Sequence, residues 1–139
     1  MGKINDQKLR RIIDANFNRA KEGLRVCEDV CRFILDDKTS SRSLKIVRHQ
    51  LTKVIEALGV HRIIEARQIE SDVGRGSIRA EFKRRDMADI FYANAQRVKE
   101  SLRVLEELTK LVADATLSRS LKNIRYQIYA IEKKVVGKI

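Results

Sequence analysis

Apolar residues recur at helical spacing through the first part of the chain. They stand mostly three or four positions apart, at Ile12, Ile13, Phe17, Ala20, Leu24, Cys27, Cys31, Ile34 and Leu35. This spacing predicts an amphipathic helix with a broad apolar face. Between residues 37 and 41 follow Asp, Thr and Ser, residue types that start helices by accepting a backbone hydrogen bond. We therefore expect a second helix after them, ending near Gly59.

The helical pattern returns in the second half of the chain after one clear interruption. Residues 71–77, with two glycines and an aspartate, predict a loop, and the preceding residues 60–70 are expected to be helical. A third helix is predicted from about Asp86 to Val112. A fourth is predicted from about Ser118 to Val135, with Leu121, Ile124, Ile128 and Ile131 facing inward. Strand patterns are absent from the sequence, so we expect an all-α protein.

The two halves of the sequence repeat one another. Residues 12–36 match residues 90–114 at eleven of twenty-five positions, and residues 41–51 match residues 118–128 at seven of eleven. The identities include polar positions as well as apolar ones. Packing alone asks only for apolar spacing, so the shared polar residues indicate a common site or common descent.

Each copy predicts a helical hairpin, and a unit of about fifty residues is marginally stable alone. We therefore expect a single domain over residues 1–139. It consists of repeat 1 at about 12–58, a connector at 59–85 and repeat 2 at about 86–136. The two hairpins should pack as a four-helix bundle-like domain with pseudo-twofold symmetry.

The composition indicates where in the cell the protein acts and which classes of partner it binds. The formal net charge of +11 would suit nucleic acid, but acidic and basic residues are interspersed without a long basic run, so a charge-laced surface is favoured. The N-terminus lacks a signal-peptide core, and no run reaches the ~18 apolar residues that span a bilayer. We expect a cytoplasmic protein without a membrane partner. Cys27 and Cys31 predict buried free thiols, because no metal-binding partners accompany them.

A ladder of polar residues three positions apart runs along the first helix of each copy. Its members are Asn16, Arg19, Glu22, Arg25 and Glu28 in the first copy, and Asn94, Arg97, Glu100, Arg103 and Glu106 in the second. Because a step of three drifts back by ~60° around a helix, Asn16 falls within the apolar face and the later members turn outward. Pairing of Arg25 with Glu28 accounts for the outer members. The buried Asn16 either bonds Asn94 across the twofold axis or lines a polar pocket with Arg19 and Arg97 beside it.

Other residues add weaker candidates. Gly23 either lets two helices approach closely or leaves room for a ligand. His49 favours a structural role, although its neighbour Arg48 leaves anion binding open. The loop from Asp72 to Ser77 offers a carboxylate for Mg²⁺ or a proton and flexible backbone N–H groups, with arginines nearby. Such an assembly suits phosphate oxygens.

Several of these strings together resemble one known family. They are DANFNRAKEGLRVCEDVCRF, SLKIVRHQL, the DVG loop and ANAQRVKESLRVLEE, in this order over about residues 12–112. The combination is similar to the small all-helical hydroxymethylpyrimidine-phosphate kinases of thiamin biosynthesis, which occur alone or fused ahead of thiamin-phosphate synthase. Two positions depart from the family pattern: Gln68 replaces an Asp, and Arg75 replaces a Thr. With no synthase barrel after residue 139, the resemblance implies the stand-alone form.

The resemblance implies an enzyme that uses ATP, with Mg²⁺ as cofactor, to convert 4-amino-5-hydroxymethyl-2-methylpyrimidine phosphate into its diphosphate. It implies Asp72 and Arg97 as catalytic residues, with Asp72 also the candidate Mg²⁺ ligand. The implied substrate-binding and phosphate-binding set is Asn16, Arg19, Glu22, Arg48, His49, Arg67, Gly74, Asn94 and Glu100. Thiamin-phosphate synthase and a second copy of this chain are the candidate protein partners.

Two alternatives to a kinase stay open. The first alternative is a non-catalytic helical module that associates with thiamin-phosphate synthase. The second is a basic nucleic-acid-binding protein, whose affinity for nucleic acid would fall steeply with salt. The copies differ at sites such as Gly23 and Ser101, and one DVG loop serves both. We therefore expect a single composite site, with an Asn-Arg-Glu set from each copy on opposite walls and the loop closing it.

Overall fold

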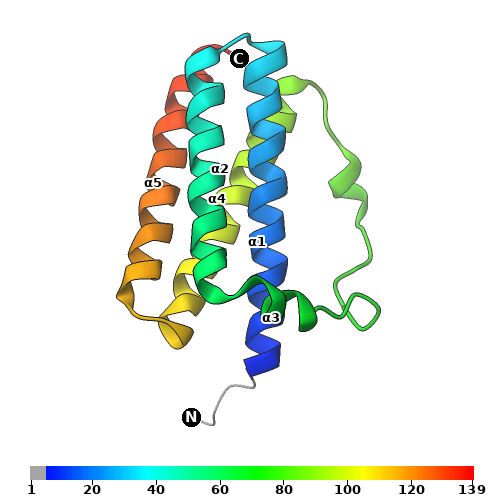
Figure 1. Ribbon diagram of the computed structural model, residues 1–139. Helices are drawn as coiled ribbons and strands as arrows, with labels where there is room; N and C mark the ends of the chain where they lie inside the picture. The colour runs from blue at the N-terminus through cyan, green and yellow to red at the C-terminus, as the bar shows by residue number, and fades with distance from the viewer. Residues whose placement is uncertain (1–5) are drawn as a thin grey trace.

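The computed structural model describes residues 6–139, except for the side chain of Ala80, and helices make up most of this length (Figure 1). The α-helices are α1 (Asp6–Asp29), α2 (Lys38–Leu58), α3 (Val60–Glu65), α4 (Met87–Val112) and α5 (Ala115–Val136). A π-helical turn, η1 (Val30–Ile34), extends α1, and a 3₁₀ turn, η2 (Arg79–Phe82), lies in the connector. No strand occurs among the described residues, so the all-α prediction is confirmed.

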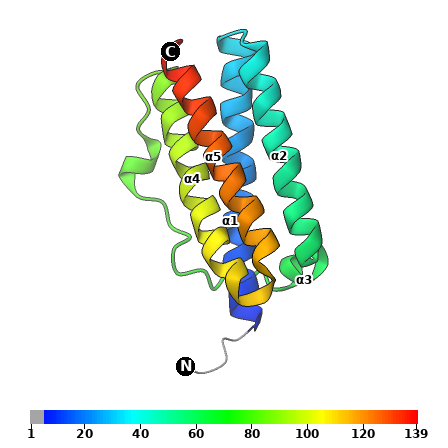
Figure 2. The same cartoon turned by 90° about the vertical axis from the view of Figure 1, so that its left-hand side faces the viewer.

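The four long helices pack side by side, each antiparallel to its neighbours (Figures 1 and 2). α1 packs against α2 and α4, and α5 packs against the same two helices, so the two sequence hairpins together form the bundle. After α3, the connector runs back along the outside of the bundle, on the side of α1 and α4 (Figures 1 and 2). The internal twofold axis and the boundaries of the domain stay predictions.

A continuous apolar core lies between the four long helices. Each helix contributes residues at helical spacing, and Leu24, Leu51 and Leu102 are among the almost fully buried ones. Burial of each such side chain stabilises the fold by roughly 1.5–3 kcal/mol. Because the buried residues come from both hairpins, this core holds the two hairpins together. The predicted free, buried thiols of Cys27 and Cys31 are confirmed. Burial raises the pKa of Cys27 to about 12, so its thiol stays protonated at neutral pH.

Aspartate side chains start three helices by accepting a backbone N–H. Asp37 accepts at 3.0 Å at the start of α2, and Asp86 accepts at 2.8 Å at the start of α4, close to the predicted starts. Asp114 does the same for α5, so that helix begins directly after it, three residues before the predicted start. α1 already covers the first described residues, from Asp6, and Leu9 extends its buried face ahead of the predicted apolar positions that begin at Ile12.

The π-helical turn absorbs a one-residue difference between the copies. The ladder residues correspond at an offset of 78, whereas the helix-starting Asp37 and Asp114 correspond at 77. The extra residue lies between them, where the N–H of Leu35 donates to the carbonyl of Val30 at 3.1 Å. Such a wider turn shifts the positions that face inward. Ile34, which the apolar pattern places on the core face, is 53% exposed, and its counterpart Val112 at the end of α4 is exposed as well.

Helices α1 and α4 approach closely at Gly23. A Cβ atom at this position would lie 2.7 Å from Cγ2 of Val98 and 3.0 Å from the carbonyl oxygen of Asn94. Of the two interpretations of Gly23, close helix approach is therefore the correct one. The contact also fixes the register of α1 against α4.

The connector is less helical than the sequence pattern predicts. α3 ends at Glu65, and residues 66–70 are irregular, which corrects the expected helix over 60–70. Ile69 in this stretch is 61% exposed, so a longer helix would bury no further apolar surface there. The predicted loop over residues 71–77 is irregular, as expected. Within residues 6–139, every helix is too short or too polar to cross a bilayer.

Candidate functional site

A pocket of about 550 Å³ lies on the outer side of the N-terminal half of α1, where the segment after α3 passes. We call it the α1 pocket. Its lining consists of Lys8, Arg11, Ile12, Asp14, Ala15, Asn16, Asn18 and Arg19 from α1, and Arg67, Gln68, Ile69 and Asp72 from the connector. The pocket thus brings together Asn16, Arg19, Arg67 and Asp72 of the predicted site. Ile12, predicted to face the core, is 44% exposed because it forms part of this lining.

An ion pair between the exposed Arg67 and the buried carboxylate of Asp14 holds the connector against α1. Nε and Nη2 of Arg67 each donate to a carboxylate oxygen of Asp14 at 2.7 Å, and Asp14 is 5% exposed. Nδ2 of Asn18 donates to the same carboxylate at 3.1 Å. Bidentate pairs of this kind are strong and geometrically specific. The hydrogen bonds to Asp14 raise the pKa of Arg67, whose donors are thereby engaged in fixing residues 66–72 beside the pocket.

Three cations in the α1 pocket have no acidic partner. Lys8, Arg11 and Arg19 make no ion pair with any residue between 6 and 139. The nearest polar contact of Arg19 is weak, with Nη1 lying 3.5 Å from Oδ1 of Asn16. Unpaired cations around a concave surface create a positive potential that attracts anions.

The polar-ladder asparagine of each copy bonds to its own helix. Nδ2 of Asn16 donates to the carbonyl of Ile12 at 2.9 Å, and Nδ2 of Asn94 donates to the carbonyl of Ile90 at 2.8 Å. Asn16 also borders the α1 pocket, so of its two interpretations the pocket fits better than a bond across a twofold axis. Apart from the long contact with Arg19, its Oδ1 has no described donor and can accept a hydrogen bond from a ligand.

Asp72 lies on the exposed loop that borders the pocket. Its Oδ1 accepts from the N–H of Gly74 at 2.9 Å, which orients the carboxylate. Between residues 6 and 139, no three His, Cys, Asp or Glu side chains gather as they would around a metal ion. Mg²⁺, however, is commonly held by one or two carboxylates together with water and substrate phosphates. The Asp72 carboxylate therefore fits Mg²⁺ that arrives with a phosphate ligand.

Arg48 of α2 lies outside the α1 pocket and is engaged by a buried carboxylate. Its Nη2 donates to Oε1 of Glu28 at 3.3 Å, and Nη1 of Arg25 donates to Oε2 of the same residue at 2.9 Å. Burial alone would raise the pKa of Glu28, but the hydrogen bonds from the two arginines outweigh it and lower the pKa. The predicted Arg25–Glu28 pair is confirmed, although Glu28 is buried rather than solvated.

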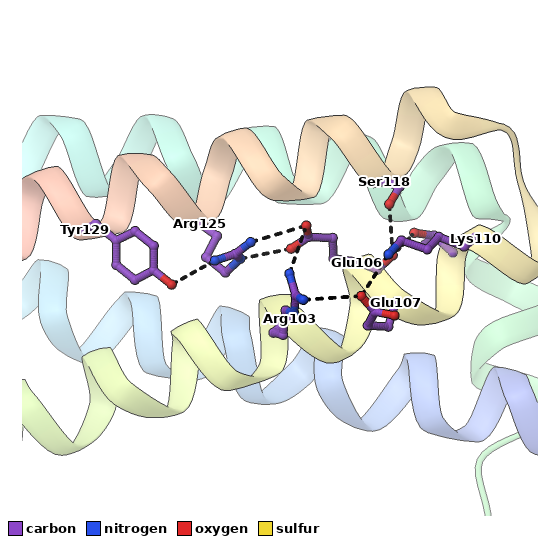
Figure 3. Close-up of polar contacts among 8 residues, drawn as sticks. Arg103, Glu106, Glu107, Lys110, Ser118, Arg125 and Tyr129 are labelled. Atoms are coloured by element: carbon purple, nitrogen blue, oxygen red, sulfur yellow. Dashed lines mark hydrogen bonds and ion pairs between the residues drawn. The ribbon is translucent and has the colours of Figure 1, made fainter.

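The second copy holds the corresponding cluster (Figure 3). Glu106 accepts from Nε of Arg125 at 2.9 Å and from Nη1 of Arg103 at 3.5 Å. Arg125 also donates to the hydroxyl of Tyr129 at 2.8 Å. These clusters link the two helices within each hairpin. The first role of Arg48 is accordingly to hold α2 against α1, and its role as a phosphate ligand stays a prediction.

Three further predicted site residues lie apart from the lining of the α1 pocket. Glu22 is exposed on α1, and His49 is exposed on α2. Glu100 accepts from Nε2 of Gln96 at 3.1 Å on the outer side of α4. The structure does not bring these side chains together with Asp72, and their roles stay predictions.

Arg97 of α4 is exposed and is not part of the lining of the α1 pocket, which consists of residues from α1 and the connector. Gly23 of α1 lies against both Asn94 and Val98 of α4, so the two helices are in close contact near Arg97. The structure does not bring Arg97 together with Arg19. The catalytic role of Arg97 and the composite site with one wall from each copy therefore stay predictions.

Four polar residues of α1 in the pocket lining were not expected from the sequence: Lys8, Arg11, Asp14 and Asn18. The first two precede the repeat, so comparing the copies cannot single them out. The other two lie within it, but Tyr92 and Gln96 stand at the corresponding positions. A search for residues that are identical in the two copies therefore misses them. The helical register is the signal that could have found them, because it places them on the outer side of α1 near Arg19.

The fold and the pocket define an all-helical bundle protein with a positively charged pocket between its first helix and its connector. Residues 11–134 match the model of the ThiD2 family, and the chain belongs to that family. The resemblance expected from the sequence is thus confirmed at the level of a thiamin-biosynthesis family.

Relatives of known name agree with this family. The chain is 39% identical over 132 residues to a thiamine-phosphate synthase of Rhodopirellula baltica, and 41% identical over 128 residues to one of Thermosynechococcus vestitus. Each alignment covers 91% of this chain but 35% of the relative, so the chain spans about a third of the length of these curated relatives. No solved structure matches the chain.

Proposed function

We propose that the chain is the kinase that transfers a phosphoryl group from ATP to 4-amino-5-hydroxymethyl-2-methylpyrimidine phosphate, forming the diphosphate. The observation that carries this proposal is the α1 pocket, in which unpaired cations surround a buried amide. Lys8, Arg11 and Arg19 can bind phosphate oxygens. Oδ1 of Asn16 can accept from the exocyclic amine of an aminopyrimidine. Membership of the ThiD2 family supports the same pathway.

The acceptor in the proposed reaction is itself an anion. An oxygen of the substrate phosphate attacks the γ-phosphorus of ATP, the bond from that phosphorus to the β–γ bridging oxygen breaks, and ADP leaves. Since the attacking oxygen is already ionised, the site has to neutralise charge and align the two phosphates rather than remove a proton. Lys8, Arg11 and Arg19 suit this task because no described carboxylate neutralises them.

The connector contributes a carboxylate to the proposed site. Asp72, oriented by the N–H of Gly74, would hold Mg²⁺ together with phosphate oxygens and water, and the ion would neutralise charge on the transferred group. The Asp14–Arg67 pair anchors the chain five residues before Asp72. The contact that holds the connector against α1 therefore also helps to place the carboxylate of Asp72.

The proposal also gives Arg97 of the second copy a role. Arg97 is exposed on α4, the helix that packs against α1, and no ion pair engages it among the described residues. Its planar guanidinium would bind phosphate oxygens of a ligand that extends beyond the lining of the α1 pocket.

Phosphorus NMR of a reaction mixture tests the proposal. Protein, ATP, Mg²⁺ and the pyrimidine monophosphate should yield ADP and the pyrimidine diphosphate. The variant Asp72→Asn should need about tenfold more Mg²⁺ for half-maximal rate, because one charge-assisted ligand is lost. Absence of diphosphate above a protein-free control would refute the proposal.

A second candidate is a non-catalytic module that associates with thiamine-phosphate synthase. The observation that favours it is the length of the relatives, since this chain spans about a third of proteins with that name. The module would bind the pyrimidine monophosphate without converting it and would be retained by a thiamine-phosphate synthase on an affinity column. Turnover in the NMR assay separates the two candidates.

A further inference from the structure

A second basic pocket, of about 390 Å³, lies at the junction of α1 and α2. Figure 1 shows this junction at the end of the bundle opposite to α3 and the start of α1. We call the pocket the junction pocket. Its lining includes Glu28, Arg32, Lys38, Ser41, Arg42 and Lys45. Glu28 is twelve residues beyond Asn16 on α1, or about 18 Å along the helix. The two pockets share no residue.

The junction pocket has an excess of unpaired positive charge. Arg32, Lys38, Arg42 and Lys45 form no ion pair with any residue that the structure describes. Glu28 does not neutralise them, because Arg25 and Arg48 already donate to both of its carboxylate oxygens. The other carboxylate of the lining, Asp36, forms no ion pair with them, and one carboxylate against four cations leaves an excess of positive charge. Four like charges around one concavity repel each other, and a bound anion would relieve that repulsion.

The second copy has no equivalent concentration of free charge. Ala115 stands where the first copy has Lys38, and Lys110, the counterpart of Arg32, pairs with Glu107 at 2.8 Å (Figure 3). If these cations only kept the helix surface soluble, we would expect similar numbers of unpaired cations at the corresponding positions of both copies. The difference indicates that the free cations belong to a feature of the first copy.

The backbone at the junction pocket is also specific to the first copy. The π-helical turn Val30–Ile34 lies beside it, and the second copy continues there as ordinary α-helix. Asp36, which also lines the pocket, has a φ of 49°, and among the described non-glycine residues it alone has a positive φ. Backbone irregularities of these two kinds concentrate at ligand sites.

We propose that the junction pocket binds the phosphates of a polyphosphate-bearing small molecule. Arg32, Arg42 and the two lysines supply charge-assisted donors, and the hydroxyl of Ser41 supplies a neutral one. Phe33 lies beside the lining, with the Arg32 guanidinium over its ring at 4.8 Å from the centroid. Its side chain is 63% exposed, so the other face of the ring could stack on a ring attached to the phosphates. This site goes beyond the proposed kinase activity, and a negative kinase assay leaves it standing.

Titration of ¹⁵N-labelled protein with inorganic tripolyphosphate, followed by amide chemical shifts, tests the proposal. Amides of residues 36–45 should shift and saturate. Arg42→Gln/Lys45→Gln should weaken this binding by about tenfold or more, since charge-assisted hydrogen bonds are lost. The matched control is Arg119→Gln/Lys122→Gln, which makes the same charge change at the corresponding positions of α5 and should alter affinity by less than about twofold.

Two outcomes would overturn the proposal. One is that shifts occur only around the α1 pocket, at residues 8–19 and 66–72. The other is that both double variants weaken binding equally, as expected for a general effect of net charge. A parallel titration with ATP identifies the source of the phosphates: tighter binding than tripolyphosphate, removed by Phe33→Leu, supports a nucleotide, whereas equal affinity supports recognition through phosphates alone.

Discussion

Three buried carboxylates bind arginines, and these arginines therefore have a structural role. Asp14 is 5% exposed, and Glu28 and Glu106 are each 4% exposed, yet every one accepts hydrogen bonds from an arginine. Removing one member of such a pair is costly, because it leaves the other charge without its partner. Arg67, held in this way, is a poorer candidate for a phosphate ligand than Arg19, which has no acidic partner.

At Gly23, a single methyl group should be enough to disturb the bundle. Gly23→Ala places a Cβ 2.7 Å from the side chain of Val98 and 3.0 Å from the backbone of Asn94. Overpacking of this kind costs about 1–3 kcal/mol, and the better helix propensity of Ala returns up to about 1 kcal/mol. Urea denaturation should therefore show a lower free energy of unfolding. Gly76→Ala, with open space around it, is the control, and equal losses in both variants would contradict the close contact.

The element most dependent on a few contacts is the connector. Its residues between 67 and 79 are exposed, and the Asp14–Arg67 pair ties its beginning to α1. Segments with few buried contacts open locally at low free-energy cost. The position of Asp72 over the α1 pocket thus depends on a contact that lies five residues away from it.

Asp14→Asn should loosen the connector more than the bundle. Amide hydrogen exchange of residues 66–72 should accelerate by about tenfold, because a charge-assisted bidentate pair is lost. Exchange in the middle of α4 should change much less. Asp89→Asn, which breaks the exposed pair with Arg85, is the control. If both variants leave exchange at residues 66–72 unchanged, the pair does not anchor the connector.

The start of α2 is tied to the C-terminal end of the chain. Asp37 accepts from Nζ of Lys138 at 2.7 Å and from the backbone N–H of Ser40 at 3.0 Å. These hydrogen bonds lower the pKa of Asp37 from its ordinary value of 3.8 to about 2. Since the unfolded chain binds this proton at the higher pH, the stabilisation is complete above about pH 4 and is lost as the pH falls towards 2.

The pH dependence of stability checks this contact. Between about pH 4 and pH 2 the free energy of unfolding should fall with pH, and Asp37→Asn should make that fall smaller. Asp29→Asn, at an exposed position of α1, serves as the control for losing one acidic residue. Identical slopes for Asp37→Asn and the parent protein would show that the Lys138 contact does not form in solution.

At the scale of the whole molecule, the sequence is sufficient to predict the helices and the core, because both follow from apolar spacing and from start signals such as Asp86. The buried position of Asn16 follows from the same periodicity. What spacing cannot predict is which distant side chains meet. The Asp14–Arg67 pair joins residues 53 positions apart, and only the path of the connector brings them together. The π-helical turn was equally hidden, since repeat alignment shows a one-residue shift but not its geometry.

The central claim is that the α1 pocket binds the reacting phosphates. The measurement that tests it most directly is kcat/KM for diphosphate formation by the parent protein, Arg19→Gln and the distant control Arg119→Gln. We predict that the parent forms the diphosphate, that Arg19→Gln lowers kcat/KM by about tenfold or more, and that Arg119→Gln stays within about twofold of the parent. No turnover by the parent, or equal kcat/KM for the two variants, would contradict the claim.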